Sequence, residues 1–203
     1  MQKILSFFLV FLFAITTSHA NTKTESQELK EYANNLVNEE YKNFNDNTLS
    51  PEEKKANTKQ FISENLYLDW MARTSLGRHR RALSKHKLKE FIQAYSKFVI
   101  KTYTELSTSY SGEKAVLKKI KQIDENMFIA NMEIIKPNGQ PPIKIDYLVH
   151  EIEEPKHKYL VGDIITEGIS TLNSQQAEFN SIISSNGIDA LITDLTNRTN
   201  AAN

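Results

Sequence analysis

Residues 127–149 read MFIANMEIIKPNGQPPIKIDYLV, and this stretch decides the fold. Apolar side chains stand at every second position on each side of a Pro137-Asn138-Gly139 turn. A period of two is that of a strand with one buried face, and Asn-Gly favours a tight hairpin turn. The apolar positions of this predicted hairpin are Phe128, Ala130, Met132 and Ile134, then Ile143, Ile145, Tyr147 and Val149.

The alternation continues on both sides of the hairpin. Upstream, Val116 and Ile120 stand among mostly polar neighbours, and downstream a further strand is predicted over residues 158–166, after a turn around Pro155. Strands that follow one another at short spacing pair as antiparallel neighbours. We therefore predict an antiparallel sheet of about four strands with one apolar face.

Apolar residues at helical spacing come before the predicted sheet. Apolar residues recur with a period of 3.6 over residues 29–44, and Ser50 to Glu53 has the pattern of a capped helix start. A short helix capped by Asp69 and a long helix over residues 84–112 are predicted next.

Helical spacing also returns after the sheet. A helix is predicted over residues 170–185, Gly187 breaks it, and a last short helix covers 188–195. Helices on one face of an antiparallel sheet make an α+β fold. We expect the long helix to lie across the concave face of the sheet.

The first twenty residues differ from the rest. Lys3 is followed by an apolar run from Ile4 to Ile15 and by small residues ending at Ala20. This is the pattern of a signal peptide, and the run is too short to span a bilayer as a helix. We predict a signal peptide over 1–20, one domain over 21–196 and a polar tail over 197–203, which makes an exported, soluble, periplasmic protein.

The composition and the absence of known motifs exclude several classes of function. Lys and Arg together number 25, as do Asp and Glu, so no overall charge favours nucleic acid or an anionic membrane. The chain has no cysteine, which excludes disulfides and a lipid-modified cysteine anchor. It has no phosphate-binding glycine loop, nucleophile elbow or metal-binding His-Glu-x-x-His motif. We therefore predict no catalytic residue, no metal and no cofactor.

Two features remain after these exclusions. The run from Arg73 to Lys89 contains seven basic residues and no acid, so it is either a solvated helix face or a docking patch. Large apolar side chains on the long helix and the sheet either fill a core or line a cavity, and periodicity alone does not separate these readings.

The chain resembles a known family at several motifs. Residues 67–78 read YLDWMARTSLGR, residues 110–113 read YSGE, and residues 161–170 read VGDIITEGIS, with Gly187-Ile188-Asp189-Ala190-Leu191 further on. Phe91, Tyr103 and Phe179 also match the pattern of this family. In order and spacing these resemble the MlaC family of periplasmic phospholipid carriers, also called the toluene-tolerance auxiliary family.

The resemblance implies an α+β fold similar to nuclear transport factor-like domains, with an apolar pocket between sheet and helices that holds acyl tails. It implies a phospholipid ligand and two partners, an inner-membrane ABC transporter complex and an outer-membrane lipoprotein–porin complex. Such a carrier moves lipid between the two membranes without chemistry of its own, and we expect a monomer. Gly168 is expected to serve a tight strand-to-helix turn.

Inward positions on the long helix and the sheet are the predicted lipid-binding residues. They are Leu76, Phe98, Val99, Tyr103, Phe128, Ile134, Ile145, Tyr147, Val149, Val161 and Ile169. The predicted partner-docking residues are Arg78, Arg80, Arg81 and Lys85.

Two other functions stay open on the sequence alone. One is an exported interaction domain with a solid core and no lipid cargo. The other is an enzyme of the same broad fold that uses a buried acid such as Asp146 or Asp163, although both fit structural or outward positions better.

Overall fold

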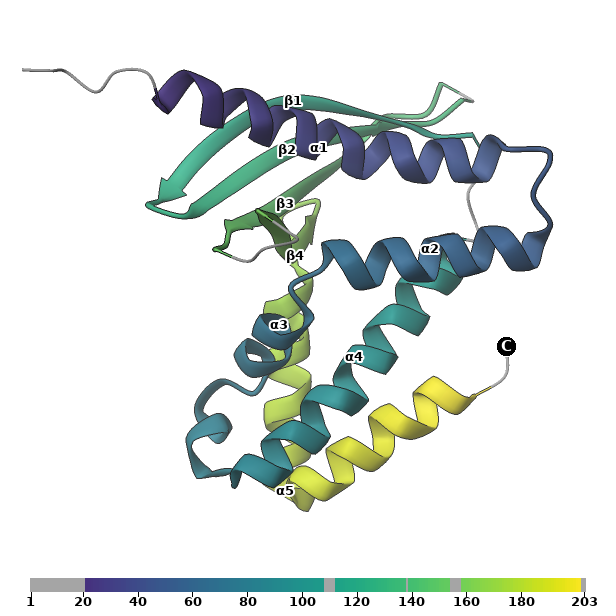
Figure 1. The fold of residues 1–203 in the computed structure, drawn as a ribbon. Coiled ribbons are helices and arrows are strands. Elements are labelled where there is room, and N and C mark those ends of the chain that lie inside the picture. Colours follow the sequence, from purple (N-terminus) through teal and green to yellow (C-terminus); the bar gives the residue numbers. More distant parts are fainter. Residues whose placement is uncertain (1–20, 108–111, 138, 154–157, 202–203) are drawn as a thin grey trace, which may run out of the picture.

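The computed structural model describes residues 21–107, 112–137, 139–153 and 158–201. The predicted signal peptide, residues 108–111 of the predicted long helix, and Asn138 of the hairpin turn lie outside this part of the chain. The described residues form one sheet and a set of helices, in the order helices, sheet, helix (Figure 1). The predicted α+β class is confirmed.

The sheet is an antiparallel meander in which every strand pairs with the next one in the chain. It has one strand more than the sequence predicts, and the additional strand is only two residues long. The strands are β1 (Lys114–Asp124), β2 (Met127–Ile135), β3 (Ile143–Glu151), β4 (Tyr159–Thr166) and β5 (Ile169–Ser170).

The hairpin register places the predicted apolar positions on one face of the sheet. Ile134 pairs with Ile143, Met132 with Ile145, and Phe128 with Val149. Paired residues of antiparallel strands point to the same side, and alternate residues share that side. We call this side the apolar face; it carries all eight apolar positions predicted from the hairpin sequence.

The helices begin and end mostly where the sequence signals place them. Ser50 caps α2 through a complete capping box with Glu53, and Ser84 accepts a hydrogen bond from the Lys87 amide at the start of α4. The helices are α1 (Asn21–Asn45), α2 (Pro51–Asn65), α3 (Leu68–Ser75), the 3-10 helix η1 (Gly77–Ala82), α4 (Lys85–Ser107) and α5 (Thr171–Asn200).

Three helix boundaries differ from the prediction. Tyr67, rather than Asp69, precedes α3, and Asp69 lies inside its first turn. Helix α1 begins at Asn21, and α5 continues to Asn200 through the first residues of the predicted polar tail. The break at Gly187 is confirmed, because its φ of 80° and ψ of 171° divide α5 into two arms (Figure 1).

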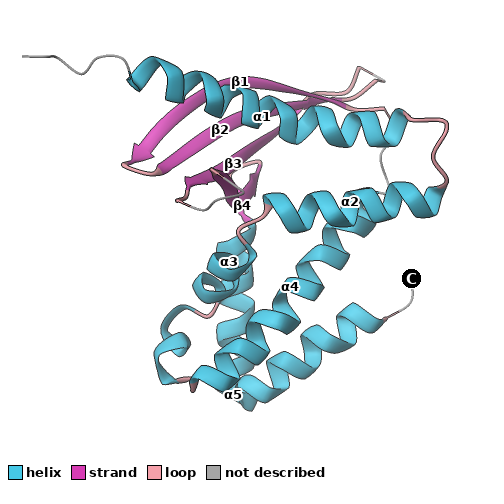
Figure 2. Cartoon of the chain, in the orientation of Figure 1, coloured by secondary structure: helices cyan, strands magenta, loops and turns pink. Residues whose placement is uncertain are grey.

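The helix that lies along the sheet is α1, which corrects the expectation for the long helix α4. Figure 2 shows α1 beside the sheet, while α4 runs through the helical part below it. Helix α4 packs against α2, α3 and α5 instead. Its apolar residues are therefore used to hold helices together, and the apolar face of the sheet is left to α1.

Two apolar clusters follow from this arrangement. The larger one is helical and centres on Met71, Phe91, Tyr95, Phe179 and Leu191, all of which are fully buried. The smaller one joins α1 to the apolar face, and its buried members are Leu29, Ala33, Ala130, Val149 and Tyr159.

The joint between β4 and α5 is fixed by a buried carboxylate. Asp163 accepts hydrogen bonds from the Ile164 and Leu172 amides at 2.9 and 3.0 Å and from the Ser170 hydroxyl. Between them, Gly168 has a φ of 81°, as its predicted role in a tight turn requires. Asp163 thus holds the sheet to the helical part, which is a structural role.

Candidate functional site

The candidate site is the apolar face of the sheet together with helix α1. Leu29 and Ala33 of α1 are buried against this face. The Tyr32 and Tyr159 ring centroids lie 5.5 Å apart, and Lys158 pairs with Glu28 at 2.6 Å between Nζ and Oε2. Burial raises the pKa of the Tyr32 phenol, because the phenolate is poorly solvated there. The first turns of α1 are therefore attached at the start of β4.

The apolar face continues along β2 and β3 past the residues of the smaller cluster. Met132 is buried, whereas Ile134, Ile143 and Ile145 are partly exposed. None of these four belongs to either packed cluster found among the described residues. Ile134, Ile143 and Ile145 give this end of the face partly exposed aliphatic surface, which is what an apolar ligand requires.

The predicted lipid-binding residues divide into two groups. Six of them lie together on the apolar face, and we refer to them below as the sheet set. It consists of Phe128, Ile134, Ile145, Tyr147, Val149 and Val161.

The other predicted residues lie elsewhere. Leu76 and Val99 are buried within the helical cluster, and Phe98 and Tyr103 pack against it. Ile169 is 67% exposed in β5, because the short turn after β4 carries its side chain to the surface. A single pocket lined by the sheet set and by α4 stays a prediction.

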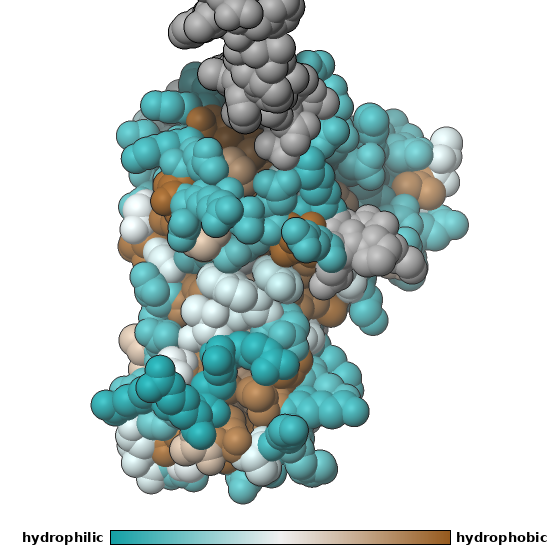
Figure 3. Space-filling model, turned by 60° about the vertical axis from the view of Figure 1, so that its left-hand side comes forward, coloured by the Kyte–Doolittle hydropathy of each residue, from teal (hydrophilic) through white to brown (hydrophobic). Residues whose placement is uncertain are grey.

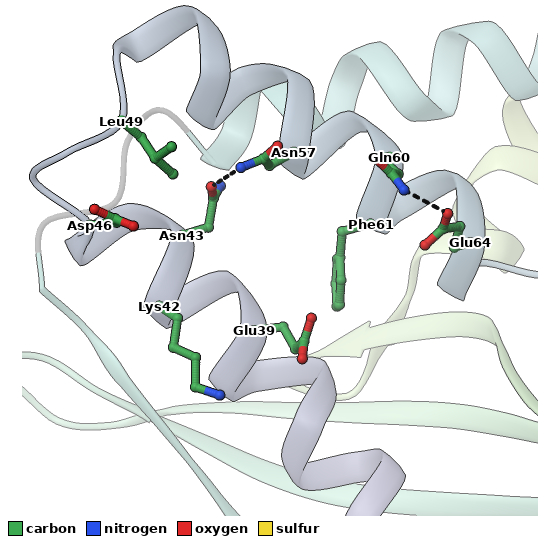
Figure 4. Close-up of a pocket in the computed structure, with 9 residues that line it drawn as sticks. All are labelled: Glu39, Lys42, Asn43, Asp46, Leu49, Asn57, Gln60, Phe61 and Glu64. Carbon is green, nitrogen blue, oxygen red and sulfur yellow. Dashed lines mark hydrogen bonds between the residues drawn. The ribbon is translucent and has the colours of Figure 1, made fainter.

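A cleft between α1 and α2 was not predicted from the sequence. It has a volume of about 360 Å³ and is lined mainly by carboxylates and amides, with Leu49 and Phe61 as its apolar side chains (Figure 4). Asn57 donates to Asn43 at 3.0 Å, and Asn43 donates to the Lys54 carbonyl and to Thr58. These bonds tie the end of α1 to α2. No sequence signal pairs Asn43 with Asn57, because the contact depends on how the two helices cross.

A buried histidine was also missed. His150 is 7% exposed, its ring lies 4.3 Å from Trp70 and 5.7 Å from Tyr67, and its Nε2 has no hydrogen-bond partner among the described residues. Desolvation lowers the pKa of this imidazole. Gly162 makes room for it, since a Cβ there would lie 2.5 Å from Nε2.

The predicted docking residues lie together at the helical end of the molecule. Arg78, Arg80 and Arg81 belong to η1 and Lys85 begins α4, and all four are exposed. In Figure 1 this segment lies below α3, at the opposite end from the apolar face. Within the described part of the chain, no helix is long and apolar enough to cross a bilayer.

These features define an α+β domain in which one helix packs on the apolar face of an antiparallel sheet. The chain belongs to the MlaC family, because the family model described as MlaC protein matches residues 25–197. The resemblance in the sequence motifs is thereby confirmed.

Two known proteins show how far the similarity reaches. The intermembrane phospholipid transport system binding protein MlaC of Haemophilus influenzae is 26% identical over 129 residues, which are 63% of this chain and 60% of that protein. The chain thus matches less than two thirds of this relative's length. A phospholipid-binding protein from Ralstonia solanacearum, solved in complex with a phospholipid, has the same fold: the TM-score is 0.61 at 15% identity, covering 87% of this chain and 95% of that one.

Proposed function

We propose that this protein is a periplasmic phospholipid carrier that holds acyl tails against the apolar face of its sheet. The observation that carries the proposal is the apolar face, which packs against Leu29 and Ala33 of α1 and also carries partly exposed isoleucines on β2 and β3. The relative from Haemophilus influenzae is named for intermembrane phospholipid transport, and the neighbour from Ralstonia solanacearum binds a phospholipid, which supports the proposal.

The energetics explain why such a carrier is needed. Each buried methylene is worth about 0.8 kcal/mol, so exposing roughly 30 of them in two acyl chains costs on the order of 25 kcal/mol. A phospholipid therefore does not cross water unaided at a useful rate. A protein surface about as apolar as the bilayer makes transfer between membrane and carrier nearly balanced. Direction must then come from the partners, for which we propose an inner-membrane ABC transporter complex and an outer-membrane lipoprotein–porin complex.

The carrier has no chemical step of its own in this proposal. The two acids considered for an enzyme have structural partners: Asp163 holds the β4–α5 joint, and Asp146 accepts a hydrogen bond from Asn131 at 2.7 Å.

Native lipid content tests the proposal directly. The mature protein is purified without detergent, extracted with organic solvent, and the extract is identified by mass spectrometry. We expect about one phospholipid per protein. A folded protein without lipid would instead support the interaction domain with a solid core.

Neighbouring isoleucines on β2 provide a matched pair for locating the tails. Ile134 lies on the apolar face, and Ile135 points to the other side and is 45% exposed. Ile134→Asp places a charge against hydrocarbon and is expected to lower bound phospholipid by more than about tenfold per folded protein. Ile135→Asp is expected to retain it. Circular dichroism confirms that both variants fold, and equal lipid content in the two would place the tails elsewhere.

A further inference from the structure

The exposed cations of η1 and the start of α4 form a surface of unusual charge for this chain. We call Arg78, Arg80, Arg81, Lys85 and Lys89 the basic ledge. Lys85 and Lys89 are one helical turn apart and therefore share a face of α4. All five are exposed, and none forms an ion pair with any residue that the structure describes. Figure 3 shows strongly hydrophilic side chains projecting from this lower end of the molecule.

Two cations next to the ledge do form ion pairs, which distinguishes them from the five residues of the ledge. Arg73 makes a two-point contact with Asp69, at 2.6 and 3.1 Å, and Lys87 pairs with Glu90 and Asp189 at 2.7 and 2.6 Å. Acidic and basic residues are equally numerous in the whole chain, so the ledge is a local excess of positive charge. Such an excess steers an oppositely charged surface toward it.

The ledge rests on a fixed support. His79 Nε2 lies 3.0 Å from the Asn180 side-chain oxygen, and Gln176 donates to the Thr74 carbonyl at 2.9 Å. Gly77 has a φ of 52° at the start of η1, and a Cβ there would lie 3.0 Å from the Gln176 amide nitrogen. Helix α5 therefore holds η1 in one position, and a preorganised surface loses less entropy when a partner binds.

A cleft of about 410 Å³ opens beside the ledge. Arg78 lines it together with the amide side chains of Asn173, Gln176 and Asn180 on α5. Amides both donate and accept hydrogen bonds, as the backbone of a bound loop requires. A cleft lined by amides and bordered by the cations of the ledge suits a partner loop that carries carboxylates.

The features of the ledge favour a protein over a bilayer. Among the residues whose burial the structure describes, the exposed large apolar side chains are Leu106, Val116, Ile123, Ile135 and Ile169, and none of them lies between residues 73 and 89. Leu83 and Leu88, which do lie there, pack against the helical cluster. The ledge thus offers no exposed large apolar anchor for insertion into a membrane, whereas peripheral membrane binding usually combines charge with such anchors.

We infer that the basic ledge is the docking surface for an acidic protein surface on a membrane complex, separate from the tail-binding face. This inference rests on the proposed carrier function, because a carrier must meet the proteins that load and unload it. The ledge and the apolar face lie at opposite ends of the molecule (Figure 1). Docking and lipid holding can therefore be disrupted independently.

Membrane vesicles from the bacterium that encodes the chain test this inference. Protein-free liposomes made from their extracted lipids, and trypsin-treated vesicles, serve as the comparison. The mature protein is expected to bind native vesicles and to lose at least about tenfold in affinity on liposomes or after trypsin. Arg80→Glu with Arg81→Glu is expected to weaken binding to native vesicles at least about tenfold, and more at low salt.

The matched control reverses two lysines at the free edge of the sheet. Lys119→Glu with Lys121→Glu changes the net charge equally in exposed positions of β1, and binding is expected to stay within about twofold. Equal loss in both variants, equal binding to liposomes, or no binding to native vesicles would overturn the inference. Phospholipid content is measured on the same preparations: its absence from every preparation refutes the carrier function, whereas its retention with unchanged docking refutes only the ledge.

Discussion

The helical cluster and the sheet cluster of this protein are packed in different ways. In the helical cluster the rings of Phe91, Tyr95 and Phe179 are fully buried, and their centroids lie 5.8 to 6.2 Å from one another. In the sheet cluster, α1 contributes a leucine and an alanine, and the apolar face continues past them. The comparison teaches that the helices supply the solid core, while the sheet keeps partly exposed aliphatic side chains on its apolar face.

Helix α1 is the part of the molecule where this difference matters most. Besides the buried Leu29 and Ala33, Glu28 and Tyr32 contact Lys158 and Tyr159, and Asn43 is bonded to α2. A single helix that packs on a sheet through one side can open at a lower cost than a helix enclosed in a cluster. We expect α1 to move away from the apolar face when lipid enters or leaves.

The largest expected effect comes from opening the helical cluster. Phe179→Ala is expected to lower the free energy of unfolding by about 3–5 kcal/mol, since it removes a fully buried ring from between two others. Urea unfolding followed by circular dichroism measures this. Ile169→Ala, at a position 67% exposed, should change the same quantity by less than about 0.5 kcal/mol. Similar losses at both positions would mean that the helical cluster is not the solid core.

The next largest effect is expected on phospholipid exchange when α1 is linked covalently to the sheet. The chain has no cysteine, so Glu28→Cys with Lys158→Cys introduces its only thiols, at a pair whose side chains meet at 2.6 Å. Joining them with a short, reducible bis-maleimide linker is expected to slow phospholipid exchange with vesicles about tenfold, because the helix can no longer open. Reduction of the linker should restore the rate.

The control for this experiment is the same double variant left unlinked, which should exchange lipid close to the wild-type rate. The ion pair it loses is surface-exposed and worth at most about 1 kcal/mol. Exchange that is equally fast in the linked protein would show that lipid reaches the apolar face without movement of α1.

The sequence predicts those parts of the fold that depend on local signals. The period of two around Pro137 and Gly139 predicts the hairpin and the face of the five sheet-set residues on β2 and β3, because register determines side-chain direction. Ser50 and Gly187 mark a helix start and a helix break through their own backbone requirements. These signals act over a few residues, so they can be read without knowing the tertiary structure.

The parts that were missed depend on packing between distant segments. Apolar spacing predicts that α1 and α4 each have a buried face, but it does not say what covers that face. The sheet was therefore expected to pack against α4, whereas it packs against α1. The bond from Gln176 to Thr74 joins residues 102 positions apart. His150 alternates with the apolar residues of β3, a pattern that predicts a solvated side chain, whereas it is buried beside Trp70.

The smallest expected effect comes from His150, which lies on the side of the sheet opposite the apolar face. It tests whether water is excluded from that side. Desolvation lowers the pKa of His150 in the folded protein below its ordinary value of about 6.5. The unfolded chain therefore binds the proton first as the medium is acidified. The contribution of His150 to the free energy of unfolding is fully present above pH ~6.5 and is lost as the pH falls below it.

His150→Phe isolates this contribution, because it removes the titrating group and keeps a ring beside Trp70 and Tyr67, which are its aromatic neighbours. Between pH 8 and pH 5 the wild-type protein is expected to lose more stability in urea unfolding than the variant does. All other side chains are the same in both proteins, so the difference between the two curves belongs to His150. Parallel curves would mean that the imidazole is hydrated in solution, and that α3 does not seal this face of the sheet as firmly as the helices seal their own cluster.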